Sequence, residues 1–577
     1  MDRFTHFASK ALSQVLETPI SPDQIETPPD PTLGDFGFPC FKLAKSWRKA
    51  PPVIAQELCE KLNNEAKESL GPLDVRAVGP YVNFNIDPQA LGNAILGEIL
   101  EGDGLGTYGK LPSGRGKWVL EYSSPNVAKP FQIYHLRGTA LGAALARVGT
   151  FRGYEVTSIN HLGDWGTQYG KLAVAFKEFG NELPEKPTMD QLVDIYIRVH
   201  KIPDENGRIT EEAREAFKKL EEGDPEITAL WKKCKEISVE HFNEIYQRIG
   251  VHFDYTWGES HYKDQLEPLI AQLKEQGLLE ESEGAWVVFV EDENGNEIPP
   301  CILLKKDGAT IYATRDLAAA LYRYKQFQFD RMTYIVGQEQ KMHFKQVFAV
   351  LRKMKVPWVS ACEHIPTGLY RFNDSKMSTR KGNVASLESI LDLAKKRVLE
   401  LMTERDKDSL IENLDETAEK IAIGAVLFHD LSHDPTKDIE LNIDRMVDFQ
   451  GETGPYLQYA HTRCLSILRK AKESGHEDFR YKQELISALI HPKEWELLKI
   501  LGQFPSQLER TLYYGKANQL ANYLVEITKA FHSFYRECHV LDQEPSTTQA
   551  RLLLVESTRR ILGQGLLLLG VPLPERM

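Results

Sequence analysis

Two short segments that lie far apart in the chain carry side chains able to act on the same phosphate group. The first, SSPNVAKPFQIYHLRG (Ser123–Gly138), follows an apolar run and leads into a helical pattern that starts near His135. Polar side chains and the first N–H groups of a helix then meet at one place, where a phosphate is favoured. The second segment, KMSTRKGN (Lys376–Asn383), places three cations among small residues and suits a triphosphate: Lys376, Arg380 and Lys381. The chemistry that uses both segments is the activation of an acid by ATP.

The elements around the first segment predict a parallel sheet. An apolar strand (Trp118–Tyr122) precedes it, a helix follows (His135–Phe151), and a second strand comes next (Tyr154–Gly163). This order is a βαβ unit, whose two strands are parallel. Further along, a strand-rich stretch (Trp286–Leu304) leads into another helix and strand, and the second half of the sheet is expected to end near Gln340. The sequence therefore predicts an α/β nucleotide-binding fold.

The two segments also resemble those of a known family. S-S-P-N-x-A-K-P-F followed by H-L-R-G resembles the first signature of the arginyl-tRNA synthetases, a subfamily of the class I aminoacyl-tRNA synthetases, and K-M-S-T-R-K-G-N resembles their K-M-S-K-S loop. The resemblance covers essentially the whole chain, down to the closing GVPLPERM. It implies an α/β Rossmann-type catalytic domain, an α+β N-terminal domain and an all-α C-terminal bundle that binds the anticodon. It also implies ATP-dependent activation of L-arginine to arginyl-adenylate, followed by transfer to the 3′ end of tRNA(Arg).

The resemblance and the composition together predict four parts. Residues 1–105 form an additional N-terminal domain that contacts the tRNA elbow, and residues 106–375 form the catalytic domain, with a helical insertion at about 183–285. Residues 376–440 carry the signature loop and a connecting helical region. Residues 441–577 form the helical anticodon-binding domain. A Gly-rich run, Glu101–Lys117, is typical of a linker.

The resemblance implies an ATP site made of residues from both segments and from the end of the strand near Gln340. The usual H-I-G-H tetrad of the family reads Gln132-Ile133-Tyr134-His135 here. The family's glycine lets adenine lie close to the backbone, so the Tyr134 ring must turn away or occupy part of that space. The expected catalytic residues are Lys129, His135, Lys376 and Lys381. Of the second segment, Lys376, Arg380 and Lys381 would stabilise the charge that grows on the leaving pyrophosphate. The expected ATP contacts are Lys129, Gln132, His135, Gly138, Gly337, His343, Lys376, Met377 and Ser378, although His343 could equally be a buried structural histidine.

The expected arginine site centres on one helix face. Tyr312 and Asp316 fall at i and i+4 and so share that face. A guanidinium is planar and always charged, so a carboxylate can hold it through two parallel hydrogen bonds, which a lysine cannot match. Asp316 could alternatively be an exposed helix charge. By resemblance, Tyr312, Asp316 and Gln340 hold the guanidinium, and Glu121, Ser123 and Asn126 surround the α-ammonium and carboxylate.

Aromatic side chains in the C-terminal part have the spacing of an RNA-binding face. Tyr456, Tyr459 and Arg463 follow i, i+3 and i+7, and Phe531 and Tyr535 follow i and i+4. Such stripes can belong to a helical core, but aromatic rings beside cations also suit stacking of unpaired bases. Tyr81 and Asn83 share one face of a strand and could hold a base or fill the core. By resemblance, all seven residues and the terminal Met577 are assigned to tRNA.

Charge and cysteine content bear on nucleic-acid binding and on metal binding. The net charge of −13 decides nothing about RNA, because a local basic patch can bind phosphate on an acidic protein. Seven cysteines without a C-x-x-C pair favour reduced thiols and argue against a zinc site. We expect Mg²⁺ to accompany ATP without a dedicated protein metal site. The expected partners are tRNA(Arg) and L-arginine, with no DNA and no membrane, and we expect a cytoplasmic monomer.

Two other readings stay open from the residues alone. A small-molecule nucleotidyltransferase could use the same two phosphate-binding segments, but it would not explain the helical, aromatic-striped C-terminal half. A synthetase-like tRNA-binding protein could have weakened or lost catalysis through Gln132 and Tyr134. Retention of Lys129, His135, Asp316 and Lys376 together favours the enzyme.

Overall fold

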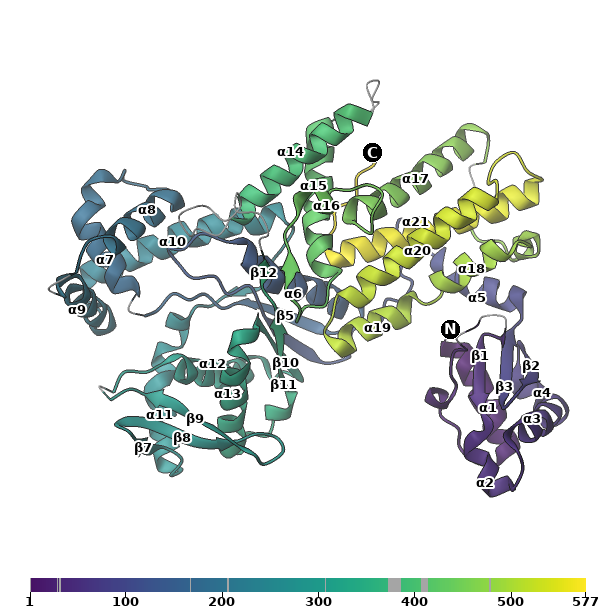
Figure 1. Cartoon of the computed structure of the whole chain (residues 1–577), viewed down its shortest axis with the longest axis horizontal. Coiled ribbons are helices and arrows are strands. Elements are labelled where there is room, and N and C mark those ends of the chain that lie inside the picture. Colours follow the sequence, from purple (N-terminus) through teal and green to yellow (C-terminus); the bar gives the residue numbers. More distant parts are fainter. Residues whose placement is uncertain are drawn as a thin grey trace. The chain divides into compact units, whose positions relative to one another are not determined.

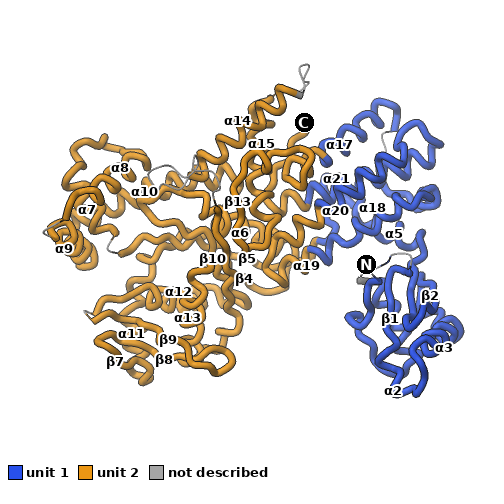
Figure 2. The backbone as a smooth tube through the Cα atoms, in the orientation of Figure 1, with its two compact units in different colours: residues 1–109, 460–507, 525–564 blue, residues 110–459, 508–524, 565–577 orange. Residues whose placement is uncertain are grey.

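The computed structural model divides the chain into two compact units (Figures 1 and 2). It describes residues 2–28, 30, 33–166, 168–204, 207–306, 308–371, 386–405, 413–476 and 479–577. Unit 1 comprises residues 1–109, 460–507 and 525–564, and unit 2 comprises residues 110–459, 508–524 and 565–577. Four helices of the C-terminal part contribute to both units: α17 (Gly454–Glu473), α19 (Phe504–Tyr514), α20 (Asn518–Glu537) and α21 (Pro545–Leu569).

Unit 2 is built on a five-stranded sheet in the order β11-β10-β4-β5-β6, with all neighbours parallel. Its strands are β4 (Lys117–Glu121), β5 (Glu155–Asn160), β6 (Tyr255–Thr256), β10 (Arg331–Gly337) and β11 (Cys362–Thr367). The predicted α/β fold is confirmed. The expected end of the sheet near Gln340 is wrong, because β11 adds a further strand beside β10. The strand order reverses between β4 and β10, and such reversal points hold ligands at the carboxyl ends of the strands.

Helix α6 (Ile133–Phe151) connects β4 to β5 and packs closely on the sheet. Gly142 makes this approach possible, because a Cβ there would overlap the ring of Tyr122. On the same sheet, α12 (Tyr312–Phe327) and α13 (Lys341–Lys353) share one buried cluster with the central strands; Val119, Leu317, Met332 and Val350 belong to it. The first turns of α6 and α12 are thereby fixed relative to β4.

Two insertions interrupt the sheet. The helices described between β5 and β6 are α7 (Gln168–Phe179), the short η4 (Gly180–Glu182), α8 (Met189–His200), α9 (Arg208–Glu222) and α10 (Pro225–Arg248). The last of these starts sharply, because Asp224 accepts the N–H groups of Glu226 and Ile227 and Pro225 occupies the first turn. Between β6 and β10 lie η5 (Glu259–Gln265), α11 (Leu266–Glu275) and an antiparallel sheet of β7 (Glu280–Ser282), β8 (Ala285–Glu291) and β9 (Glu297–Leu304).

After β11, unit 2 continues into a helical region. A short parallel pair joins β12 (Tyr370–Arg371) to β13 (Ile439–Glu440). The described helices here are α14 (Leu387–Arg405), α15 (Leu414–Leu431) and α16 (Ile443–Met446). Residues 372–385, between β12 and α14, carry the second signature and lie outside the described residues.

Unit 1 contains a three-stranded antiparallel sheet in the order β1-β3-β2, from β1 (Phe36–Pro39), β2 (Leu73–Val78) and β3 (Tyr81–Ile86). The sequence pattern of Ala77–Ile86 predicts a single strand. The structure divides this stretch between the end of β2 and the whole of β3, because Gly79 adopts a left-handed conformation (φ +55°) and reverses the chain between them.

The remaining described elements of unit 1 are helical. They are α1 (Asp2–Leu16), η1 (Pro22–Gln24), η3 (Cys40–Leu43), α2 (Ala44–Trp47), α3 (Pro51–Glu65), α4 (Lys67–Leu70), α5 (Pro88–Ile99), η8 (Gln483–Ala488), α18 (Pro492–Leu501) and parts of α17, α19, α20 and α21. Across the residues described in either unit, no helix is both long and apolar enough to cross a membrane. No cluster of metal-ligating side chains occurs among them either.

Candidate active site

The loop after β4 has a strained backbone that tertiary contacts hold in place. Ser123, Ser124 and Ala128 all have positive φ angles, of 76°, 50° and 60°. Each such residue costs on the order of 1–3 kcal/mol, and such strain is concentrated at functional sites. The Oγ of Ser123 lies 2.7 Å from the hydroxyl of Tyr246 on α10, which also accepts a hydrogen bond from Asn160. The insertion thus helps to shape the loop that carries the first signature.

The first turn of α6 presents His135 as a neutral hydrogen-bond donor. The backbone N–H of Gln132 donates to Nδ1 of His135 over 3.0 Å, so the ring proton belongs on Nε2. Burial, together with a smaller effect of the nearby Lys129 ammonium, lowers the pKa of His135 to about 4, although the hydrogen bond with the Gln132 backbone opposes the shift. A neutral imidazole with an Nε2–H group can therefore donate to a phosphate oxygen at neutral pH.

Two aromatic rings from the preceding residues lie beside this histidine. The centroid of the Phe131 ring is 4.9 Å from that of the His135 ring, and the centroid of the Tyr134 ring is 4.3 Å from it. The Tyr134 side chain is 41% exposed. Gln132 forms the N-cap of α6, and Gly138 lies one turn further on, where a Cβ would stand 3.4 Å from the carbonyl of Ile335 on β10.

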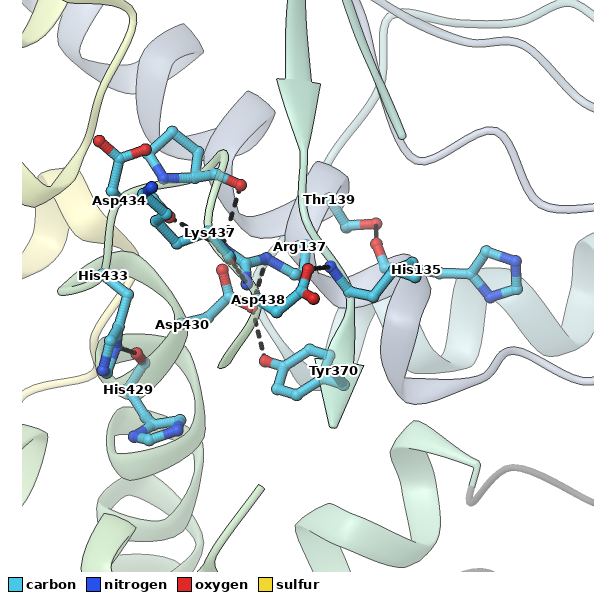
Figure 3. A network of polar contacts seen from close by, with 12 residues as sticks. His135, Arg137, Thr139, Tyr370, His429, Asp430, His433, Asp434, Lys437 and Asp438 are labelled. Atoms are coloured by element: carbon cyan, nitrogen blue, oxygen red, sulfur yellow. Dashed lines mark hydrogen bonds and ion pairs between the residues drawn. The ribbon is translucent and has the colours of Figure 1, made fainter. Parts of the chain in front are cut away.

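The chain on both sides of residues 372–385 is attached to the first signature. On the far side, Ser386 forms an isolated antiparallel bridge with Gln132, and Leu387 N–H donates to the carbonyl of Phe131 over 3.0 Å. On the near side, β12 is linked to α6 through Arg137 (Figure 3). The expected residues Lys376, Met377, Ser378 and Lys381 fall outside the described residues, but described residues on either side of them are linked to Phe131, Gln132 and Arg137.

Asp316 lies inside a group of histidine and arginine side chains. Nε2 of His343 is 2.5 Å from its Oδ2, and Nε2 of His161 is 3.9 Å from its Oδ1. Burial by itself would raise the pKa of Asp316, but the hydrogen bond with His343 and the positive potential of His343, His161 and Arg323 lower it. Asp316 is therefore a carboxylate at neutral pH, and its side chain is 21% exposed. Tyr312, one turn earlier, is 68% exposed.

Glu121 at the end of β4 is engaged by an arginine. Its Oε2 forms an ion pair with Nη1 of Arg323, whose side chain is fully buried. Arg323 also donates to the hydroxyl of Tyr262 and lies 3.2 Å from Nδ1 of His161. Glu121 was expected beside the α-ammonium group of the amino acid. The structure leaves one carboxylate oxygen, Oε1, outside this ion pair.

A second buried carboxyl group, Glu259, lies close to Asp316. Its Oε2 is 2.8 Å from Nη1 of Arg315, the residue before Asp316 on α12. Burial raises the pKa of Glu259 to about 8; Arg315 opposes the shift, and the negative charges of Asp316 and Asp164 add to it. Sequence reasoning missed Glu259 and Arg323. The spacing of Asp316 and Arg323, i and i+7 on one helix face, could have indicated the latter.

The other expected small-molecule contacts lie at the same edge of the sheet. Asn126 forms an isolated parallel bridge with Gly163 after β5. Gly337 ends β10, and Gln340 is an exposed residue of η6 (Gln338–Gln340). Lys129 is half-buried in the first-signature loop. These residues come from the ends of β4, β5 and β10, which is where a doubly wound sheet binds its ligands.

The residues expected to contact tRNA belong to both units and differ in how far they are exposed. In unit 1, the Arg463 guanidinium lies 4.8 Å from the ring of Tyr535, whereas Phe531 is fully buried. Asn83 is also buried and donates to the carbonyl of Leu33, and Tyr81 packs edge-on against Phe41. In unit 2, Tyr459 is 37% exposed, Tyr456 is half-buried, and Met577 is partly exposed at the end of the chain.

Comparison with known proteins agrees with this fold. Residues 99–443 match the family model of the class I tRNA synthetase (R) catalytic domain, residues 457–577 match the DALR anticodon binding domain, and residues 3–86 match the arginyl tRNA synthetase N-terminal domain. The parallel sheet and its two signatures thus define a class I aminoacyl-tRNA synthetase.

Individual relatives show to which family within this class the chain belongs. Arginine–tRNA ligases of Clostridium perfringens and Clostridium kluyveri are 44% and 43% identical, each over 96% of both chains. The structure of Thermus thermophilus arginyl-tRNA synthetase superposes with a TM-score of 0.82 at 25% identity, covering 99% of both chains. The chain belongs to the arginyl-tRNA synthetase family, the arginine–tRNA ligases. The predicted family is confirmed, and the ligase is supported over the tRNA-binding protein without catalysis.

Proposed function

We propose that the described site activates arginine through the residues assigned to it. The arginine carboxylate attacks the α-phosphate of ATP, arginyl-adenylate forms, and pyrophosphate leaves; the terminal ribose hydroxyl of tRNA(Arg) then takes the arginyl group. The observation that carries the proposal is that His135 and Asp316 lie on helices that pack on one parallel sheet, while Ser386 pairs with Gln132 and Tyr370 is linked through Asp430 to Arg137 on the helix of His135. Such chemistry needs positioning and electrostatic stabilisation more than acid–base catalysis.

A pyrophosphate-exchange assay tests this proposal. We expect exchange when arginine, ATP and tRNA(Arg) are all present, and none when lysine or citrulline replaces arginine. Lysine lacks the planar fork of donors, and citrulline lacks the positive charge, so each removes one property that Asp316 recognises. Tight binding of tRNA without any exchange would instead support the non-catalytic reading.

For ATP, His135 and Lys129 hold phosphate oxygens, and Gln132 and Gly138 contact the nucleotide from the start of α6. Lys376 and Lys381, with Met377 and Ser378, are proposed for the pyrophosphate end. Gly337 borders the ribose. Mg²⁺ accompanies the triphosphate, and carboxylate or water oxygens are its usual ligands. His343 is proposed as an indirect participant, because its Nε2 is hydrogen-bonded to Asp316.

For arginine, Asp316 takes the guanidinium, with Tyr312 and Gln340 at the rim. Ser123 and Asn126 hold the carboxylate and ammonium end. Oε1 of Glu121 is proposed for the α-ammonium, while its Oε2 remains with Arg323. Glu259 is proposed to form part of the acidic side of the pocket, because the negative charge of Asp316 helps to raise the pKa of its carboxyl group.

Binding of arginine is expected to release protons through Glu259. In the free protein its pKa is about 8, above the usual value of 4.5, so it is largely protonated at neutral pH. A bound guanidinium adds positive charge nearby and lowers that pKa, so a proton leaves between about pH 5 and 8. Calorimetry of arginine binding in two buffers of different ionisation enthalpy measures the released protons.

The matched variant Glu259→Gln keeps the shape of the side chain and removes the titration. We expect the buffer dependence of the binding enthalpy to disappear in this variant. An unchanged buffer dependence in Glu259→Gln would assign the proton to another group.

For tRNA, Tyr535 and Arg463 of unit 1 are proposed to hold an unpaired base, the ring by stacking and the guanidinium by charge. Tyr456, Tyr459 and Met577 are proposed as further contacts, as are Tyr81 and Asn83 in the N-terminal part. Phe531 is proposed to act indirectly, since it is fully buried while its ring lies 6.2 Å from that of Tyr535.

Tyr535→Ala is expected to weaken tRNA(Arg) binding by about 1–3 kcal/mol, roughly tenfold to 100-fold in Kd, because one stacked base is lost. Filter binding or fluorescence anisotropy measures this change, and the KM for arginine should stay constant. The matched control is Tyr196→Ala, a half-buried tyrosine on α8 outside all proposed contacts. Equal weakening in both variants would argue against a specific stacking site.

The assembly and location of the protein are also proposals. The sequence favours a cytoplasmic monomer whose partners are tRNA(Arg), arginine and ATP. Light scattering of the protein alone, and again with tRNA(Arg), measures the number of copies.

A further inference from the structure

A buried charged cluster connects helix α6 to the chain just before the second signature (Figure 3). Arg137 of the H-L-R-G run is 1% exposed, and its Nε lies 3.9 Å from Oδ2 of Asp430, which is 4% exposed. The same Oδ2 accepts a hydrogen bond of 2.5 Å from the hydroxyl of Tyr370 on β12. An arginine is rarely buried without such partners, because the removal of its charge from water is costly.

The other guanidinium nitrogens of Arg137 hold the turn between α15 and β13. Nη1 donates to the carbonyl of Lys437 over 2.8 Å, and Nη2 lies 3.3 Å and 3.2 Å from the carbonyls of Asp434 and Pro435. A guanidinium can serve several acceptors in fixed directions, whereas an ammonium group acts as a point charge. The turn is therefore fixed to α6 by one side chain.

The turn between α15 and β13 also holds β12 in place. The Asp438 carboxylate accepts the backbone N–H of Leu369 and two donors of Arg371, and Gly368 N–H donates to the carbonyl of Pro435. Gly368 must be glycine for this approach, because a Cβ there would stand 2.5 Å from the carbonyl of Lys437. Arg371 is the last described residue before the second signature, and with Gln338 and residues 436–440 it lines a cavity of about 540 Å³.

We infer that Arg137, Asp430 and Tyr370 are positioning residues for the activation reaction. They fix β12, the last described strand before Lys376, relative to His135, which lies two residues before Arg137 on α6. The inference rests on the proposed role of Lys376. It also gives a reason for the arginine in the H-L-R-G run, because Arg137 connects the helix of the first signature to the strand that precedes the second signature. None of the three side chains is proposed to touch substrate.

The test uses variants that change the cluster with little change in shape. Tyr370→Phe removes only the hydroxyl, and Arg137→Lys keeps the charge but cannot reach the three carbonyls and Asp430 together. We expect kcat of pyrophosphate exchange to fall by about tenfold to 100-fold in both, since displacements of about 1 Å have such effects. The KM for arginine should stay within about twofold, because the Asp316 pocket is built from other elements.

The matched control lies at the other end of the same helix. Arg152, the C-cap of α6, is also buried and forms an ion pair with Glu509, 2.5 Å from Nη2 to Oε1. Arg152→Lys should lower Tm about as much as Arg137→Lys while kcat stays within about twofold. An equal loss of kcat in the control, or an unchanged kcat in Tyr370→Phe and Arg137→Lys, would overturn the inference, because the cluster would then act only on stability.

A double-mutant cycle with Lys376→Ala separates this inference from the function it rests on. If the cluster acts through the segment of Lys376, adding Tyr370→Phe to Lys376→Ala should cost much less than Tyr370→Phe alone. Fully additive losses of kcat would mean that the cluster does not act through the segment of Lys376. If Lys376→Ala alone leaves exchange unchanged, the proposed role of Lys376 fails, whereas a kcat loss confined to the cluster variants would still assign Arg137 and Tyr370 a positioning role.

Discussion

Replacement of Asp316 by alanine is expected to raise the KM for arginine by about 100-fold to 1,000-fold. The carboxylate is the acceptor for a guanidinium in a partly buried pocket, and loss of one partner of such a pair costs about 3–4 kcal/mol. His343 and His161, which flank Asp316 in the free protein, would then face the ligand without a counter-charge. Pyrophosphate exchange at varied arginine measures the change.

Two further measurements make the Asp316 prediction specific. The Kd for tRNA(Arg) should be unchanged, because the pocket lies at the sheet edge of unit 2. Asp444→Asn is the matched control, since Asp444 is an exposed carboxylate paired with Arg397 over 2.9 Å, and exposed pairs contribute little. An unchanged KM for arginine in Asp316→Ala would refute the proposed pocket.

His135→Ala is expected to lower kcat of arginine activation by about 100-fold to 1,000-fold, the usual loss when one donor to developing charge is removed. The KM for arginine should change little, because the lost contact is to the nucleotide. His241→Ala, a half-buried histidine on α10 outside the proposed site, serves as the control. A KM effect without a kcat effect would mean that His135 binds ATP equally in the ground state and the transition state.

The pH dependence of this variant follows from the lowered pKa. The ring of His135 titrates at about 4 in the folded protein against 6.5 when unperturbed, so it stays neutral throughout the range of about pH 6–8. The ratio of kcat between wild type and His135→Ala should therefore be constant over that range. The stability contribution of the neutral ring is present above about pH 6.5 and is lost as the pH falls towards 4, because the unfolded state then binds the proton more readily. A ratio that changes with a midpoint near pH 6.5 would contradict the assigned tautomer.

Local sequence patterns were enough to predict the segments to which the proposed chemistry is assigned. The first signature, the strand before it and the helix after it follow from local patterns, and the structure has them as β4, the strained loop and α6. The shared face of Tyr312 and Asp316 follows from the helical period alone, because residues four apart lie one above the other. Chain order of strands and helices was sufficient for the parallel sheet.

Only the tertiary structure decided which side chains meet. Glu121 is paired with Arg323, 202 residues away, and Glu259 with Arg315, 56 residues away. Local patterns give the face on which a side chain lies, but not its partner across another element. The same reason explains why β11 was missed, why the stretch from Ala77 turned into a hairpin, and why Phe531 lies in the core although its spacing suited RNA. The role of Arg137 appeared only when α6, α15 and β12 were brought together, since the acceptors of its guanidinium are backbone carbonyls about 300 residues further along the chain.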